Sequence, residues 1–225
     1  MNAALKASLE NNGYAIVPSV LTQNEISLLA NEPSFQLQNN APVGIRSIVQ
    51  KSIAAHALAH SPAIRSLVEP VLGAKARLVR SILFNKNRDT NWNVTWHQDL
   101  SIAVRSRFDI SGFVAWSEKE GVPHVQPPPT LLEQMLTVRI HLDDANANNG
   151  ALWVAPGSHR CGRIRSEETT ATVAHFGQHL CAAQAGDVLL MRPLLLHTSR
   201  KTESDVQRRV IHLEFSGFNL PAPLE

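Results

Sequence analysis

The sequence predicts a mainly β fold, a jelly roll braced by helices that are gathered at the N-terminal end of the chain. Residues 1–75 contain most of the helix signals, whereas residues 76–216 contain many short apolar strand segments at fairly even spacing. Strands in such numbers form a barrel or a sandwich, and the preceding helices pack on one face. The length of 225 residues is that of one domain. We therefore expect a single domain over residues 1–225, with a helical part (1–75) and a β-barrel core (76–216).

The helical part carries clear start and stop signals. Thr22 and Glu25 match a capping box, which begins a helix. Ser61–Pro62 marks the start of a later helix, and Gly73 marks its end. We expect helices over 3–12, 22–30, 51–59 and 62–72, and short strands over 14–18 and 45–49.

The β-barrel core is expected from segments rich in β-branched and aromatic residues. These segments are 76–85, 93–98, 112–116, 136–142, 151–154, 186–191 and 208–215. Asn149–Gly150 marks a tight turn before one of them. Residues 121–129 are too rich in proline for a central strand. We expect a loop there, either a lid over the site or a stiff connector.

Composition and charge exclude several classes of protein. The formal net charge is only +2 and the basic residues are scattered, so we expect no binding of nucleic acid or membranes. No apolar run is long enough for a membrane span, and the first residues lack the apolar core of a secretory signal. The two cysteines, Cys161 and Cys181, do not suggest a disulfide framework. We expect a cytoplasmic monomer or homodimer that acts on a small molecule.

The candidate metal ligands are His97, Asp99 and His197. His97 and Asp99 lie two residues apart at the end of an expected strand, where alternate side chains share a face. His197 follows a different strand far along the chain, and a rolled-up sheet can bring the two segments together. Two imidazoles and one carboxylate form the facial triad of non-haem Fe(II) oxygenases. Taken singly, these residues would be a surface histidine, a turn aspartate and a hydrogen-bonded histidine.

Arg208 and Ser199 are candidate ligands of a 2-oxo acid, the cosubstrate that such an iron centre needs. A 2-oxo acid chelates the metal at one end, and its far carboxylate needs a fixed cation, for which the arginine fork is suited. Alternation along 208–215 places Arg208 on the face opposite to Ile211 and Leu213. If the apolar face packs on the helices, Arg208 points into the barrel. The alternative is an Arg208 solvated at the start of its strand.

These motifs resemble, in order, those of the phytanoyl-CoA dioxygenase family of Fe(II)/2-oxoglutarate oxygenases, especially its small bacterial members. The resemblance covers roughly residues 80–216. The matching segments are 83–86, 96–100, 142–144, 149–160, 186–190 and 197–199, followed by Arg208. It implies a double-stranded β-helix fold, Fe(II) held by the His97, Asp99 and His197 triad, and 2-oxoglutarate and O2 as cosubstrates. It also implies that Arg208, helped by Ser199, holds 2-oxoglutarate.

Two further basic residues follow from the resemblance. Better-known members place a tryptophan against the cosubstrate where this chain has Arg139. Arg139 therefore contacts 2-oxoglutarate or a substrate anion, unless it pairs with Asp143 or another carboxylate in the barrel. The family also uses a basic residue from a strand before the barrel, and Arg46 is the nearest candidate here.

We therefore expect an Fe(II)- and 2-oxoglutarate-dependent dioxygenase that hydroxylates an unactivated C–H bond of a small molecule and releases succinate and CO2. Asp99 favours hydroxylation because relatives that halogenate lack this carboxylate, although desaturation and ring formation use the same ligands. Two other interpretations stay open: a cupin-like metal enzyme that uses no 2-oxo acid, and a non-catalytic binding module on the same fold. Candidate substrate contacts lie beside the metal motif or in the proline-rich segment: Trp96, Arg105, Arg107, His124 and Gln126.

Overall fold

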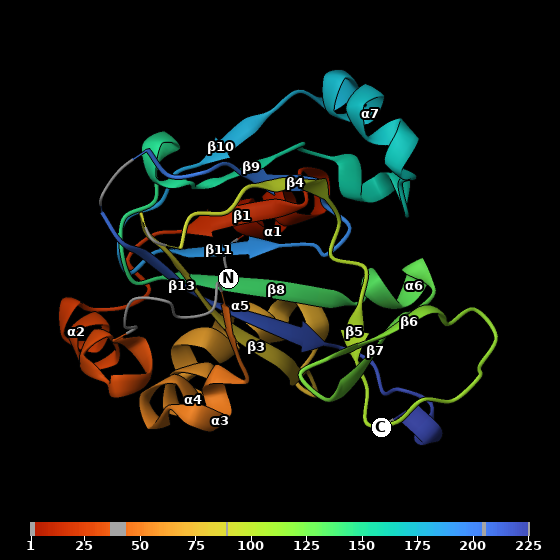
Figure 1. The fold of residues 1–225 in the computed structure, drawn as a ribbon, viewed down its shortest axis with the longest axis horizontal. Coiled ribbons are helices and arrows are strands. Elements are labelled where there is room, and N and C mark those ends of the chain that lie inside the picture. Colours follow the sequence, from red (N-terminus) through yellow and green to blue (C-terminus); the bar gives the residue numbers. More distant parts are fainter. Residues whose placement is uncertain (1–2, 37–43, 89, 204–205, 225) are drawn as a thin grey trace.

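Two antiparallel β-sheets lie one above the other, and helices cover the outer side of the larger sheet (Figure 1). The computed structural model describes residues 3–36, 44–88, 90–203 and 206–224. The predicted jelly roll with flanking helices is confirmed. Among the described helices, none is long and apolar enough to cross a membrane.

The helices of the first third pack against the larger sheet. They are α1 (Ala3–Asn11), α2 (Gln23–Asn31), α3 (Ile48–Lys51), α4 (Ile53–Ala59) and α5 (Pro62–Leu72). The capping box predicted at the start of α2 is present, since Glu25 N donates to Thr22 Oγ1 at 3.3 Å and Thr22 N donates to Glu25 Oε2 at 2.8 Å. Buried apolar side chains of these helices, Ile64 among them, join those of the strands in the main core.

The larger sheet has six antiparallel strands. In spatial order they are β1 (Tyr14–Val17), β11 (Val188–Met191), β8 (Met135–His141), β13 (Arg208–Ser216), β3 (Arg77–Lys86) and β2 (Gly44–Arg46). Strand β2 is shorter than the predicted strand over 45–49. Ser47 adopts a left-handed conformation (φ 56°), which ends the strand and turns the chain into α3.

The smaller sheet has four strands. In spatial order they are β10 (His179–Cys181), β9 (Leu152–Val154), β12 (His197–Ser199) and β4 (Val94–His97). Leu152 and Val154 pack against Leu189 and Met191 of β11, so a layer of apolar side chains fills one part of the space between the sheets. Further helical segments lie in the connections: α7 (Thr169–Phe176), η1 (Pro33–Phe35), η2 (Ala147–Asn149), η3 (Ser158–Cys161), η4 (Ser166–Glu168) and η5 (Ala222–Leu224).

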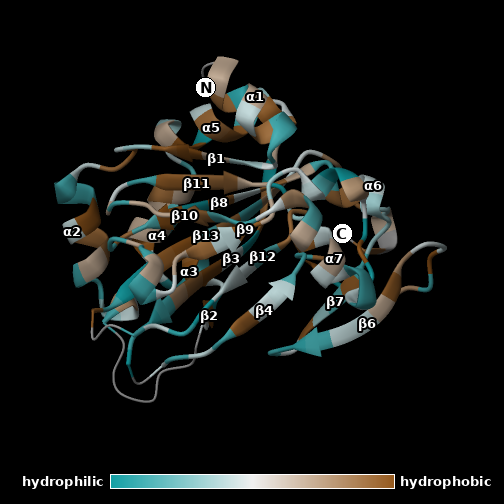
Figure 2. Cartoon of the chain, turned by 90° about the horizontal axis from the view of Figure 1, so that it is seen from above, coloured by the Kyte–Doolittle hydropathy of each residue, from teal (hydrophilic) through white to brown (hydrophobic). Residues whose placement is uncertain are grey.

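The two faces of β13 differ as its alternation predicts. Ile211, Leu213 and Phe215 belong to the core that the helices cover. Arg208 and His212 therefore face the smaller sheet, and both are buried. Figure 2 shows hydrophobic residues along β11 of the larger sheet and mixed colours along β4 and β6. Between the two sheets, apolar side chains of β9 and β11 fill one part of the space, and the buried Arg208 and His212 lie in another.

A third, three-stranded sheet lies beside the barrel and corrects the expectation of a loop over 121–129 (Figure 1). It consists of β5 (Ile102–Ala103), β7 (Val122–Gln126) and β6 (Val114–Lys119), and α6 (Pro129–Leu132) follows it. Strand β7 is the central one, although it contains Pro123. Pro123 has no N–H to donate, but β5 is only two residues long and Pro123 lies opposite the position just after its end. There Val104 N donates to the Pro123 carbonyl at 3.0 Å, a hydrogen bond that needs no N–H from the proline.

Candidate metal centre

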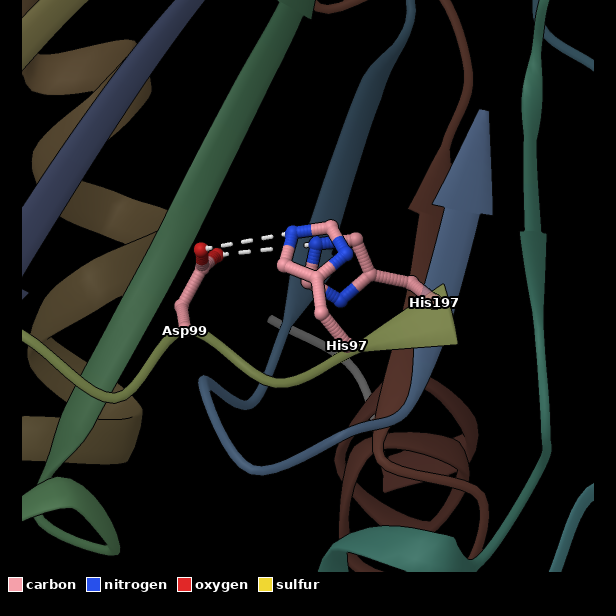
Figure 3. A group of neighbouring side chains, drawn as sticks. All are labelled: His97, Asp99 and His197. Carbon is pink, nitrogen blue, oxygen red and sulfur yellow. Dashed lines mark ion pairs between the residues drawn. The ribbon is translucent and has the colours of Figure 1, made fainter. Parts of the chain in front are cut away.

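The two histidines of the candidate triad lie directly opposite each other on neighbouring strands (Figure 3). His97 is the last residue of β4 and His197 the first of β12, and their ring centroids are 4.2 Å apart. Asp99 follows β4, where its backbone N donates to Pro193 O at 2.9 Å. The structure therefore brings His197 together with His97 and Asp99, which lie about a hundred positions earlier in the sequence.

The ligand atoms of the triad lie close to one another. His97 Nε2 lies 4.0 Å from Asp99 Oδ1, and His197 Nε2 lies 3.7 Å from Asp99 Oδ2. Metal–ligand bonds of about 2.1 Å place two ligand atoms of one ion at most about 4.2 Å apart. Both distances fall below this limit but exceed the separation of about 3 Å between neighbouring ligands of an octahedral ion. All three ligand atoms lie within 4.8 Å of one another, so small side-chain movements would let one ion bind all three residues.

Hydrogen bonds orient both imidazole rings for metal binding. His97 Nδ1 donates to the Thr95 carbonyl and His197 Nδ1 donates to the Leu195 carbonyl, each at 2.9 Å. A carbonyl only accepts, so the proton of each neutral ring is on Nδ1 and the lone pair is on Nε2, which faces Asp99. This is the tautomer that a metal-binding histidine needs.

The protonation states also suit a divalent cation. Burial and the neighbouring His97 lower the pKa of His197 to about 3, so its ring is neutral at pH 7. Burial raises the pKa of Asp99, but His197, His212, His97 and Arg80 outweigh this effect and hold that pKa below its usual value. Asp99 Oδ2 is buried without a hydrogen-bond partner among the described residues. A neutral His197 imidazole and an unsatisfied carboxylate oxygen of Asp99 fit an ion such as Fe(II).

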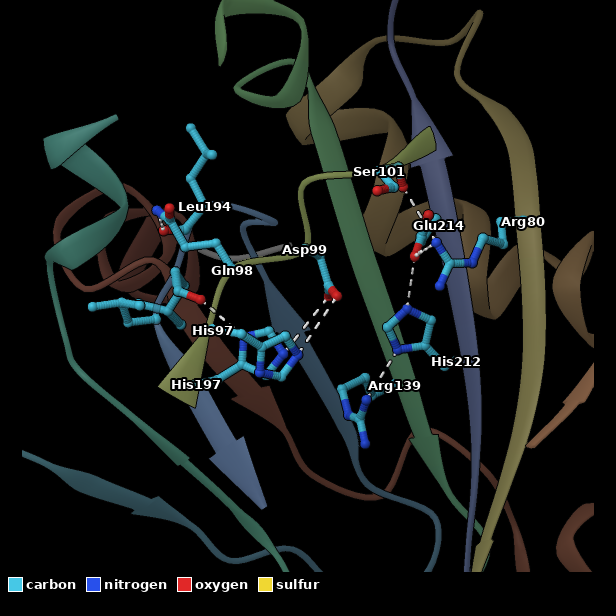
Figure 4. Close-up of polar contacts among 12 residues, drawn as sticks. Arg80, His97, Gln98, Asp99, Ser101, Arg139, Leu194, His197, His212 and Glu214 are labelled. Atoms are coloured by element: carbon cyan, nitrogen blue, oxygen red, sulfur yellow. Dashed lines mark hydrogen bonds and ion pairs between the residues drawn. The ribbon is translucent and has the colours of Figure 1, made fainter. Parts of the chain in front are cut away.

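Gln98, between two candidate ligands in the chain, ties their segments together (Figure 4). Its Nε2 donates to Leu194 O at 2.6 Å and to Gly162 O at 2.8 Å, and its Oε1 accepts from Ile164 N at 2.8 Å. Gln98 thereby fixes the end of β4 against the segment that leads into β12.

A cavity of about 80 Å³ lies beside the triad and is strongly cationic. Arg208 and Arg139 line it together with Ser199. Arg208 is only 2 % exposed, and its Nε has no hydrogen-bond partner among the described residues. Burial and the neighbouring Arg139 lower the pKa of Arg208 to about 9, which still leaves it charged at pH 7. A buried guanidinium with an unused donor is suited to an anionic ligand.

Arg80 also lines this cavity, and Lys86 adds a fourth cation near it, which the sequence analysis missed. Its Nζ donates to Ser199 Oγ and to Arg200 O at 2.8 and 2.6 Å and lies 4.7 Å from the centre of the Trp92 ring. Burial, Arg208 and Arg139 lower the pKa of Lys86 to about 7. Alternation along β3 could have revealed it, because Lys86 lies on the face of Phe84, which lines the cavity.

Arg139 does not pair with Asp143. Its Nη1 donates to His212 Nδ1 at 2.9 Å, whereas Asp143 accepts two side-chain hydrogen bonds from Arg209, at 2.9 and 2.8 Å. His212 and Glu214 are further functional candidates that the sequence analysis missed, since both lie close enough to Asp99 to share a cation with it.

The other sequence candidates lie away from the triad cavity. Arg46 is on β2 at the edge of the larger sheet, where its Nε lies 3.2 Å from Glu120 Oε1. Trp96 packs against Val173 and Leu196. The five suggested substrate contacts are not among the described residues that line the cavity: Trp96, Arg105, Arg107, His124 and Gln126.

The fold and the site define a class of protein: a jelly roll that holds two histidines and one carboxylate at the ends of neighbouring strands, beside a buried arginine. The family described as phytanoyl-CoA dioxygenase (PhyH) matches residues 9–210, and the chain belongs to this family. The resemblance found in the motifs is therefore confirmed. No curated protein sequence matches the chain.

Several solved structures share this fold. EctD from S. alaskensis with 2-oxoglutarate and 5-hydroxyectoine has a TM-score of 0.73 and 18% identity, over 96% of this chain and 76% of that chain. HygX from Streptomyces hygroscopicus with nickel and 2-oxoglutarate bound has a TM-score of 0.68 and 16% identity, over 96% and 86%. The non-heme alpha ketoglutarate dependent carbocyclase SnoK from nogalamycin biosynthesis has a TM-score of 0.70 and 17% identity, over 96% and 84%. At these identities the likeness establishes the fold alone.

Proposed function

We propose that the chain is an Fe(II)- and 2-oxoglutarate-dependent oxygenase that hydroxylates an unactivated C–H bond of a small molecule. One observation carries the proposal: a buried, charged Arg208 with an unused donor lies in the same small cavity as two histidines and a carboxylate. Such a cation is suited to the far carboxylate of a 2-oxo acid that chelates the metal. Membership of the phytanoyl-CoA dioxygenase family supports the same conclusion.

In this proposal His97, Asp99 and His197 hold the iron on one side and leave its other side to the cosubstrate and O2. Bound iron supplies the oxidation of 2-oxoglutarate by O2 to succinate and CO2, coupled to hydroxylation of the substrate.

Arg208 binds the far carboxylate of 2-oxoglutarate through its fork of N–H donors. Ser199 donates its hydroxyl proton to Gly150 O at 2.8 Å and accepts a hydrogen bond from Lys86. Ser199 therefore holds Lys86 at the cavity instead of donating to 2-oxoglutarate itself.

Hydroxylation is the simplest outcome for this ligand set, and other outcomes are known on the fold. SnoK is a carbocyclase and SnoN is an epimerase, and both share the fold at under 25% identity. The presence of Asp99 as a third ligand favours hydroxylation in this chain.

Anaerobic titration with Fe(II) and 2-oxoglutarate tests the proposal through the visible charge-transfer band of the chelate. Wild type should develop the band, and His97→Ala should lose it. In Arg208→Gln the 2-oxoglutarate concentration at half-saturation should rise by roughly 10- to 100-fold, because a charge-assisted hydrogen-bond pair is lost.

Matched controls separate site effects from general ones. His60→Ala and Arg165→Ala each remove an exposed side chain of the same type and should behave as wild type. Absence of the band in folded wild-type protein at saturating ligand would refute the oxygenase and favour a metal site that uses no 2-oxo acid.

A further inference from the structure

A second hollow, of about 210 Å³, opens next to the triad cavity at the edge of the larger sheet. Its walls come from β2 and β3 on one side and from the β6–β7 hairpin and β5 on the other. The polar residues that line it are Arg46, Ser47, Gln50, Arg80, Ser81, Lys119, Glu120 and His124. Among the described residues, Arg80 lines both this hollow and the triad cavity, and the other residues that line the triad cavity do not line the hollow.

The hollow carries an excess of positive charge. Arg46, Arg80 and Lys119 converge on it from three different strands, against one carboxylate, Glu120. Lys119 has no ion-pair partner among the described residues. Burial, Arg80 and Arg46 lower the pKa of Lys119, as expected for like charges held together at a partly buried site.

Two of these cations hold unused donors inside the protein. Arg46 Nη1 and Arg80 Nε are both buried without a hydrogen-bond partner among the described residues. Leaving a buried donor of a charged group unpaired is costly, so these two donors are available to water or to a bound ligand. An oxyanion in the hollow would accept from both guanidinium groups and from the Lys119 ammonium.

The hollow adjoins the triad cavity through Arg80, which lines both. Arg80 Nη1 lies 3.4 Å from Glu214 Oε1, and Glu214 lies within ligand distance of Asp99 (Figure 4). A molecule anchored beside Arg80 therefore lies next to the Asp99 side of the metal centre. Arg208 and Arg139, which line the triad cavity and not the hollow, remain available to the cosubstrate.

We propose that Arg46, Arg80 and Lys119 bind the oxyanion group, carboxylate or phosphate, of a small organic substrate and so direct its carbon skeleton toward the iron. This inference rests on the proposed function and adds to it the chemical class of the substrate. It places Arg46 at the substrate instead of at 2-oxoglutarate, because Arg46 does not line the cavity of the triad.

Ligand-observed NMR tests the proposal with two probes, acetate for a carboxylate and methylphosphonate for a phosphate. Each is titrated into metal-free protein and into anaerobic protein loaded with Fe(II) and 2-oxoglutarate, and methyl linewidths are followed. Wild type should bind at least one probe saturably in both forms. In the loaded form the methyl resonance should broaden further, because Fe(II) is paramagnetic and nearby.

The variant Arg46→Gln/Lys119→Gln should weaken the binding of that probe roughly tenfold or more. The matched control, Lys6→Gln/Lys75→Gln, removes the same net charge at exposed positions and should bind as wild type does. Arg80 is left intact because its loss would leave the buried Glu214 carboxylate without its ion-pair partner. Glu120, the ion-pair partner of Arg46, is exposed and stays solvated when Arg46 is replaced. Circular dichroism confirms that each variant is folded.

Two results would overturn the proposal: no saturable binding of either probe to wild type, or equal binding by wild type and the Arg46/Lys119 variant. Failure of the oxygenase assignment is separately visible, because it removes the chelate band of wild type and leaves probe binding by metal-free protein unaffected.

Discussion

Arg139 donates a hydrogen bond from Nη1 to Nδ1 of His212 at 2.9 Å, and this contact fixes the tautomer of the histidine. Because Nδ1 accepts, the ring carries its proton on Nε2, which donates to Glu214 Oε1 at 3.0 Å. Glu214 in turn faces Arg80. The result is a chain of four polar groups across β8, β13 and β3, in which Arg139, His212 and Glu214 are buried and Arg80 is partly buried (Figure 4).

Replacement of His212 by leucine should destabilise the protein by about 1–3 kcal/mol. The substitution leaves the buried Arg139 and Glu214 without the group that joins them. Glutamine is the control, since its amide both accepts and donates, and His212→Gln should retain more of the stability. Urea denaturation measures both variants, and equal losses would show that the hydrogen bonds contribute little.

Gln98→Leu should weaken Fe(II) binding about tenfold, because outer hydrogen bonds that orient metal ligands typically contribute this much. The substitution removes the contacts to Leu194, Gly162 and Ile164 that hold β4 against the segment before β12. Competition with a chromophoric chelator measures the affinity. Gln184→Leu, at an exposed position, is the control, and an unchanged affinity in Gln98→Leu would mean that the backbone alone positions the ligands.

Gly150→Ala should destabilise the protein and disturb the Lys86 site. Gly150 has a φ of 79°, and an added Cβ would lie 2.8 Å from Arg200 O and 2.8 Å from Lys86 Cδ. The left-handed backbone alone costs about 1–2 kcal/mol. Gly121→Ala has a similar φ of 78° and open space around it, so it isolates the backbone effect. Thermal unfolding should show the larger loss for Gly150→Ala.

The stability of wild type relative to Lys86→Met should increase with pH above 7. Burial lowers the pKa of Lys86 from 10.5 to about 7 in the folded protein. Between these values the unfolded chain binds the extra proton, so raising the pH favours the folded state, by up to about 1.4 kcal/mol per pH unit. Below pH 7 both states are protonated and the difference is constant.

Urea denaturation of both proteins at pH 6, 7, 8 and 9 measures this difference. Lys75→Met, which removes an exposed lysine, should show no such trend against wild type. A constant difference between wild type and Lys86→Met from pH 7 to 9 would contradict the lowered pKa.

The sequence was sufficient to predict the fold class and the meeting of distant segments. Alternation along β13 correctly assigned Ile211 and Leu213 to the helix-covered core and Arg208 to the interior. This worked because a strand with one apolar face has a single orientation in which that face is buried.

The charged network was harder to predict because it depends on strand pairing. Lys86 lies opposite Arg208, and Arg139 opposite His212, only because β3 and β8 flank β13 in this register. A single sequence does not specify which strands are neighbours. For the same reason the sequence offers Asp143 as an alternative partner of Arg139, because Asp143 lies near it in the chain, whereas in the structure Asp143 pairs with Arg209.

The third sheet was missed for a local reason. Prolines in 121–129 argue against a central strand. The argument fails where the neighbouring strand is too short to need the missing N–H, as β5 is beside Pro123.

The two sheets contribute different parts of the proposed site, and this has a mechanical consequence. His97 and His197 belong to the four-stranded sheet, whereas Arg208 and Arg139 belong to the six-stranded one. A 2-oxo acid that chelates the metal and reaches Arg208 would act as a removable cross-link between the layers. Its binding would then raise the melting temperature only when metal is present, and its release would uncouple the two sheets at this site.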